Sequence, residues 1–154
     1  TILTSTDGTS WDNRTSGTSN ILFGVTYGNG LFVVVGRSGT ILTSSDGISW
    51  TSRTSGTSNT LNGVTYGDGK FFAVGSLGTI LKSSDGITWT EVSESANDNS
   101  SGLNGTINDI TYGNGTYVLV GSLIGDVYSS SDGNSWTSRT SGTSNYLNGV
   151  TYIE

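Results

Sequence analysis

One seven-residue pattern, Ser-x-Asp-Gly-x-x-Trp, occurs four times along the chain and constrains the fold more than any other feature. Its tryptophans stand at positions 11, 50, 89 and 136, so the copies are spaced by 39, 39 and 47 residues. A period near 40 residues indicates a repeat architecture, and in a sequence that reads as strands it matches one propeller blade per repeat. The sequence therefore predicts an all-β chain of repeated sheets.

We interpret each copy of the motif as a tight corner between two strands. The Asp side chain can accept hydrogen bonds from backbone N–H groups just ahead of it, Gly supplies a positive φ, and Ser is a second local acceptor. Trp then carries a large apolar surface between the sheets. We expect a structural role, because one carboxylate falls far short of the roughly six to eight oxygen ligands of Ca²⁺. The motif residues are Ser5, Asp7, Gly8, Trp11, Ser44, Asp46, Gly47, Trp50, Ser83, Asp85, Gly86, Trp89, Ser130, Asp132, Gly133 and Trp136.

The four motif copies resemble the Asp-box, or BNR repeat, of sialidase-like propellers and of propellers like the photosystem II assembly factor. The usual Asp-box has one more residue between Asp and Gly than any copy in this chain. The resemblance covers nearly the whole chain and implies a β-propeller. It does not imply sialidase chemistry, because in that family the Asp-boxes lie away from the active site.

Each full repeat contains four predicted strands. We call them A, B, C and D in blade order. Residues 61–66 are an example of A and residues 71–74 of B, and in the blade before, residues 40–42 are an example of C and residues 50–53 of D. Asn-Gly or Asp-Gly between A and B indicates a type I′ hairpin turn. The nearly continuous apolar B strands indicate burial on both faces, as expected for a sheet between two neighbouring blades.

The strand pattern predicts one repeat domain over residues 1–154, with repeats at 1–39, 40–78, 79–125 and 126–154. The strands read CD-ABCD-ABCD-ABCD-A, which makes fifteen strands and about 3.75 blades of four antiparallel strands. Unpaired strand edges are sites for pairing with another chain. We therefore expect self-association or further repeats of a longer chain, and Thr1 in place of an initiator Met suggests a trimmed or excerpted sequence.

Composition limits the chemistry that the chain can perform. Twelve acidic and six basic side chains give a net charge of −6, which argues against nucleic acid or an anionic membrane as partner. The chain has no Cys and no His, which removes disulfides, thiol chemistry, an imidazole base and the usual zinc ligands. We expect no cofactor, no metal site and no membrane insertion. The polar Thr, Ser and Asn-rich composition favours an extracellular or cell-surface location.

Several side chains recur at equivalent repeat positions and are candidate functional residues. Arg14, Arg53 and Arg139 invite comparison with the three arginines by which sialidases grip a carboxylate, but equivalent residues of a propeller are spread around the ring. We expect them to pack their stems and pair locally. The tyrosines that end each A strand, with three asparagines, could instead form a polar ligand-binding ring at one mouth of the channel. These residues are Tyr27, Tyr66, Tyr112, Tyr152, Asn62, Asn108 and Asn148.

The longer third repeat carries an insert between Thr90 and Ile107. It contains Glu91, Glu94 and Asp98, and we interpret it as a solvated loop, although insertions also mark binding faces. The favoured function is a non-catalytic propeller scaffold or interaction module, not an enzyme. One alternative is a glycan-binding module of a secreted or phage-like surface protein, and a glycan or a peptide is the possible ligand of the polar ring. The other is a fragment of a sialidase-like glycoside hydrolase, for which Glu91 and Glu94 are the only loosely suitable carboxylate pair.

Overall fold

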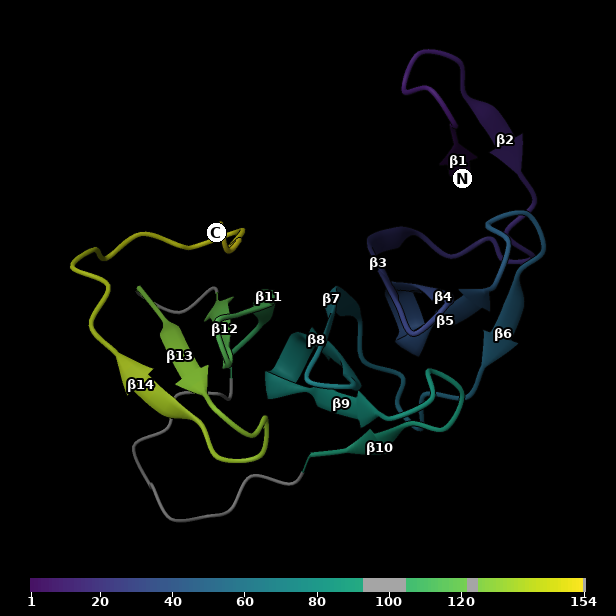
Figure 1. The fold of residues 1–154 in the computed structure, drawn as a ribbon. Coiled ribbons are helices and arrows are strands. Elements are labelled where there is room, and N and C mark those ends of the chain that lie inside the picture. Colours follow the sequence, from purple (N-terminus) through teal and green to yellow (C-terminus); the bar gives the residue numbers. More distant parts are fainter. Residues whose placement is uncertain (93–104, 122–124, 154) are drawn as a thin grey trace.

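The computed structural model describes residues 1–92, 105–121 and 125–153. In these ranges the chain forms β-strands and two short 3-10 turns, η1 (Arg37–Gly39) and η2 (Ser76–Gly78) (Figure 1). The strands are β1 (Ile2–Thr4), β2 (Asp12–Arg14), β3 (Leu22–Gly28), β4 (Leu31–Gly36), β5 (Ile41–Ser44), β6 (Thr51–Arg53), β7 (Leu61–Gly67), β8 (Lys70–Gly75), β9 (Ile80–Ser83), β10 (Thr90–Glu91), β11 (Ile107–Gly113), β12 (Thr116–Gly121), β13 (Val127–Ser130) and β14 (Thr137–Arg139).

The strands form three four-stranded antiparallel sheets and one two-stranded hairpin. The sheet orders are β3-β4-β5-β6, β7-β8-β9-β10 and β11-β12-β13-β14, and β1 pairs with β2. The inner strand β7 contacts both β3 and β11, so the three sheets follow one another along an arc (Figure 1). This arrangement confirms the expected all-β fold built from four-stranded antiparallel propeller blades.

Two-residue turns close the hairpin between the first and second strand of each sheet. Between β3 and β4, Asn29 and Gly30 have φ values of +49° and +74°. Asp68 and Gly69 take +47° and +72° at the same place in the second sheet. Positive φ at both central positions defines a type I′ turn, whose twist matches that of the flanking strands. The hairpins read from Asn-Gly and Asp-Gly are therefore confirmed.

The core lies between the sheets, and β8 shows how it is built. Phe71 and Ala73 pack with side chains of the first sheet, whereas Phe72 and Val74 pack with side chains of the third. All four are fully buried, with 0% of their surface exposed. Alternate residues of a strand point to opposite faces, so one continuous apolar run fills two separate cores. This confirms the expectation that the second strands are sandwiched between neighbouring blades.

The fifteenth predicted strand, the last A strand, is wrong, because the structure assigns no strand to residues 147–152. Residues 147–152 repeat the sequence of β7 up to Tyr66, but they form no ladder with any described strand. Their place at the end of the arc is that of an inner strand beside β11 (Figure 1). An inner strand pairs in its own sheet with a second strand, and the described residues provide none for this segment. The segment therefore has the position of a strand without its ladder.

Candidate functional site

The Ser-x-Asp-Gly-x-x-Trp motif forms the corner between the third and fourth strand of each sheet. In the second copy, Asp46 Oδ1 accepts hydrogen bonds from the backbone N–H groups of Ile48 and Ser49, both at 2.8 Å. Ser44 Oγ donates to the same oxygen at 2.8 Å and accepts from the N–H of Gly47, whose φ is +72°. The other copies repeat this arrangement around Asp7, Asp85 and Asp132.

The backbone donors of the motif hold the pKa of its aspartates below their usual range. The N–H groups of Ser49 and Ile48, helped by the Ser44 hydroxyl, lower the pKa of Asp46 to about 2. The equivalent donors lower the pKa of Asp85 and of Asp132 to about 2 as well. Hydrogen bonds to the charged form of a carboxylate stabilise that form. These carboxylates are therefore ionised at neutral pH and bound to their own backbone.

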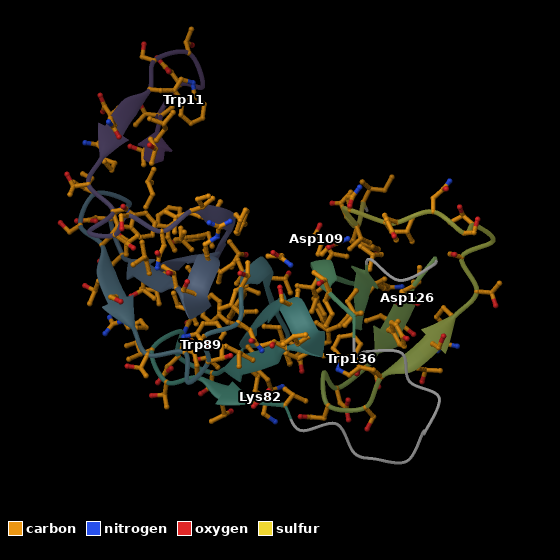
Figure 2. The ribbon with its side chains drawn as sticks, turned by 180° about the vertical axis from the view of Figure 1, so that it is seen from behind. Trp11, Lys82, Trp89, Asp109, Asp126 and Trp136 are labelled. Atoms are coloured by element: carbon orange, nitrogen blue, oxygen red, sulfur yellow. The ribbon has the colours of Figure 1, made fainter. Side chains whose placement is uncertain are left out.

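The glycine of the motif packs against the preceding sheet. A Cβ at Gly86 would lie 2.6 Å from Cδ2 of Leu31 in the first sheet, and one at Gly133 would overlap the ring of Phe72 in the second. Trp89 Nε1 donates to the carbonyl oxygen of Gly86 at 3.0 Å, which fixes the indole beneath the corner. In Figure 2, Trp89 lies at the base of the sheets, whereas Trp11 stands apart on the β1–β2 hairpin. The motif thus joins each sheet to the one before it.

The three repeat-equivalent arginines each bond to the neighbouring strand of their own sheet. Each Nε donates to a hydroxyl oxygen at 2.7–2.8 Å. The pairs are Arg14–Thr4, Arg53–Thr43 and Arg139–Ser129. Because they belong to three different sheets and have partners there, they do not form one carboxylate-binding centre.

The Thr-Ser-Gly-Thr-Ser-Asn loops use many of their polar groups to connect successive sheets. Ser55 Oγ donates to the carbonyl oxygen of Thr57 at 3.1 Å, within the loop. Asn59 Nδ2 donates to Thr79 Oγ1 at 2.9 Å, and its carbonyl oxygen accepts from the N–H of Gly39 at 2.8 Å. The hydroxyl-rich appearance of these loops is therefore explained in part by turn formation and by contacts between blades.

Three of the four predicted tyrosines lie on glycines of the preceding inner strand, whereas Tyr27 is exposed. A Cβ at Gly28 would overlap the ring of Tyr66 and lie 2.6 Å from its Cβ atom. Tyr112 covers Gly67 in the same manner, and Tyr152 covers Gly113. The rings of Tyr66 and Tyr112 also pack on an aromatic side chain of their own sheet. These tyrosines have a packing role between blades, and a ligand-binding role for their hydroxyls stays a prediction.

The asparagines predicted to line a channel mouth also bridge inner strands. Asn62 Nδ2 donates to the carbonyl oxygen of Ile107 at 2.9 Å. Asn108 Nδ2 donates to the carbonyl oxygen of Leu147 at 2.8 Å and lies 3.4 Å from Oδ1 of Asn148. The structure therefore brings Asn108 and Asn148 together and uses the amides of Asn62 and Asn108 to attach each inner strand to the next.

Sequence reasoning missed the part played by Asp109. This residue replaces a glycine found at positions 24 and 63, where the inner strand bulges against its neighbour. Its Oδ2 accepts the backbone N–H of Val150 at 3.0 Å, while its Oδ1 accepts the N–H of Ile110 at 2.8 Å. The one signal in the sequence was that an aspartate stands at position 109 where the other repeats have glycine. The carboxylate thus attaches the C-terminal segment to β11 in place of a ladder.

The face of the first sheet that points away from the second sheet is apolar and exposed. Val25 on β3 is 63% exposed, whereas the equivalent Val64 and Ile110 on the next two inner strands are 8% and 3% exposed. The other large exposed apolar side chains around it are Leu3, Trp11, Phe23 and Tyr27. Together with the β1–β2 hairpin, this face bounds a groove of about 690 Å³. Apolar patches of this kind mark interaction sites.

The remaining predicted site falls largely outside the described residues. Glu91 ends β10, whereas Glu94 and Asp98 lie in the range 93–104, which the structure does not describe. Among the described residues, no three His, Cys, Asp or Glu side chains gather as metal ligands. The same residues include no helix of the length and hydropathy needed to cross a bilayer.

Comparison with known proteins identifies the fold and no family. No protein-family model matches the sequence, and no curated protein does. Among solved structures, YCF48 from Cyanidioschyzon merolae matches with a TM-score of 0.64 at 22% identity over 79% of this chain and 37% of that one. A structure of YCF48 bound to D1 peptide matches with a TM-score of 0.65 at 21% identity, over 79% of this chain and 41% of that one.

A third match supports the same architecture. The WD40 β-propeller domain of Doa1 has a TM-score of 0.60 at 14% identity, over 82% of this chain and 43% of that one. The chain spans less than half the length of each of these three structures. At such identities the likeness is one of fold alone. The fold of this chain is that of a β-propeller section.

Proposed function

We propose that this chain is part of a non-catalytic β-propeller scaffold that binds peptides or proteins. We further propose that β-strands from outside residues 1–154 complete it, either as further repeats of a longer chain or as a second copy. The single observation that carries the proposal is the uncovered apolar face of β3, where Val25 is exposed although its equivalents are buried.

Two further observations support a scaffold. The motif aspartates recur in all four repeats and the equivalent arginines in three of them, and both have hydrogen-bond partners within their own sheet. A structure of YCF48 bound to D1 peptide has the same fold, which makes a peptide the class of partner to test first. Strand addition at a sheet edge is a general mode of peptide binding.

The proposal is tested by the binding of the dye ANS to the chain, with the solution mass measured by light scattering. We expect the wild-type chain to bind the dye and Val25→Asp to reduce this binding, because the aspartate would interrupt the apolar face. Leu77→Asp is the matched control, since Leu77 is exposed at a turn away from this face.

The outcomes separate the two ways of completing the scaffold. Dye binding with a mass of 15.9 kDa favours further repeats of a longer chain, whereas a larger mass with dye binding that rises on dilution favours a second copy that covers the face. A chain of 15.9 kDa that binds no dye would contradict the proposal, because its β3 face would then not be free.

A further inference from the structure

The groove beside β3 lies where the sheet that contains β1 and β2 would have its first and second strands. Residues 2–4 of β1 correspond in sequence to residues 41–43 of β5, and β2 corresponds to β6, so the β1–β2 hairpin supplies a third and a fourth strand. In the complete sheets, the first and second strands lie inside these two. The groove between the hairpin and β3 is bounded by Leu3, Phe23 and Val25. Two strands at about 4.8 Å spacing would fill it and cover the apolar face.

We propose that this groove binds a β-hairpin of the type formed by the chain's own first and second strands, with a glycine opposite Tyr27. This inference rests on the proposed function and names its partner and its contact. It follows from the interface that recurs between β3 and β7 and again between β7 and β11.

The position of Tyr27 shows where the bound hairpin must carry a glycine. At both complete interfaces, the tyrosine of one inner strand covers a glycine of the strand before it, and any Cβ there would overlap the ring. Tyr27 is 59% exposed, yet its ring already packs on Phe32 at a centroid distance of 4.6 Å and an interplanar angle of 50°. Tyr66 packs on Phe71 at 4.6 Å and 53°. Tyr27 is therefore held in the binding conformation without a partner, which lowers the entropic cost of docking.

The position of Gly47 indicates where the second strand of the bound hairpin must carry an apolar residue. The equivalent Gly86 would place a Cβ 3.5 Å from Val33 on β4, and Gly133 lies against Phe72 at the same position of β8. Gly47 meets only side chains of Thr4 and Phe32, at 3.6 and 3.7 Å. A hairpin in the groove would bring its third residue of the second strand over Gly47, and an apolar side chain there would complete the contact.

The same reasoning disfavours the C-terminal segment of a second copy as the occupant. Residues 147–152 have the same sequence as residues 61–66, but Ile153 stands where β3, β7 and β11 end in glycine. A side chain at that position would meet the ring of Tyr27, just as a side chain at Gly28 would meet the ring of Tyr66. A hairpin that keeps the glycine fits the groove better.

The probe is a fluorescein-labelled peptide with the sequence of residues 61–75, titrated with the full chain and followed by fluorescence anisotropy. We expect saturable binding. The matched control peptide carries Gly67→Ile and should bind about 5- to 140-fold more weakly, because an overpacked contact costs about 1–3 kcal/mol.

Chain variants locate the contact. Tyr27→Ala should bind both peptides with affinities within about threefold of each other, since the ring that selects glycine is gone. Val25→Asp should weaken both peptides about equally. Because Tyr27 and Val25 are exposed in the chain, neither change removes a buried core side chain. Unchanged unfolding midpoints would verify that both variants remain folded.

Three results would overturn the inference. They are the absence of saturable peptide binding, equal affinity of the wild-type chain for both peptides, and multimers of the chain that the peptide fails to dissociate. The last result would make a second copy the occupant. Dye binding at the β3 face without peptide binding would leave the scaffold standing and refute only the hairpin, whereas loss of both would refute both.

Discussion

The contact between Gly28 and Tyr66 makes a quantitative prediction about how the blades are held together. Gly28→Ala places a methyl group 2.6 Å from the Tyr66 Cβ atom and inside van der Waals range of its ring, where carbons need about 3.5 Å. The first and second sheets would have to separate locally by roughly 1 Å. Overpacking of this kind costs about 1–3 kcal/mol. With a urea m-value of about 2 kcal/mol/M, the unfolding midpoint should fall by about 0.5–1.5 M.

A second background reverses the expected sign. Tyr66→Gly removes the three atoms nearest to the new methyl, and the φ of Gly28 is not in the left-handed region. In this background, Gly28→Ala should be neutral or stabilise by about 0.4–1 kcal/mol, because alanine restricts the unfolded chain. The assay is urea unfolding followed by tryptophan fluorescence, with an unchanged m-value as the condition for comparing midpoints.

A control variant separates this contact from a general effect of adding methyl groups to inner strands. Gly149→Ala adds the same group to the C-terminal segment, where the nearest atom is Oδ2 of Asp109 at 3.7 Å. Its effect should lie within about 0.5 kcal/mol of zero. If Gly28→Ala cost the same with and without the Tyr66 ring, the ring would not be what excludes a side chain there, and the reasoning about blade contacts would fail.

Two further predictions concern the motif. Trp89→Ala should destabilise the chain by about 3–5 kcal/mol, because the indole is buried between sheets, whereas Trp11→Ala should cost less than about 1 kcal/mol because Trp11 is exposed; equal shifts of the thermal midpoint would contradict this reading. The depressed pKa of about 2 at Asp85 contributes stability that is complete above its unfolded value near 4 and lost as pH falls toward 2. The unfolding midpoint should therefore drop over this window more in the wild type than in Asp85→Asn, and parallel pH profiles would refute the assignment.

Much of the fold could be predicted because local chemistry repeats in the sequence. The interval of about 40 residues between tryptophans indicated one four-stranded sheet per repeat. Asn-Gly and Asp-Gly indicated the hairpin turns within the sheets. The apolar run at residues 71–74 indicated burial on both faces, which the structure confirms. Such signals are readable because each depends on neighbours within a few residues.

The contacts between blades could not be read in the same way. Gly28, Gly67 and Gly113 stand next to hairpin turns in the sequence, yet the missing side chain of each makes room for a ring about 40 residues further along the chain. The bonds of the Asn62 and Asn108 amides to the next inner strand were not foreseen, and the polar ring stays a prediction. The alternation of residues along a strand predicts on which face of the sheet a side chain lies. Which strand of the neighbouring sheet that face contacts is known only from the arrangement of the sheets along the arc. The fifteenth strand was wrong for a related reason, because a strand sequence forms no ladder when its partner strand is missing among the described residues.

The order of tyrosine and glycine gives the arc a direction. Every ring reaches backward along the chain onto the sheet before it, so one end of the array presents a knob and the other end presents a socket. A knob cannot meet a second knob, so this contact is not isologous, and two copies could close through it only as a ring in which each knob meets the other copy's socket. Any assembly made through it is head-to-tail. With Ile153 in the socket position, the two ends of this chain are mismatched, which favours extension by a different sequence over polymerisation with itself.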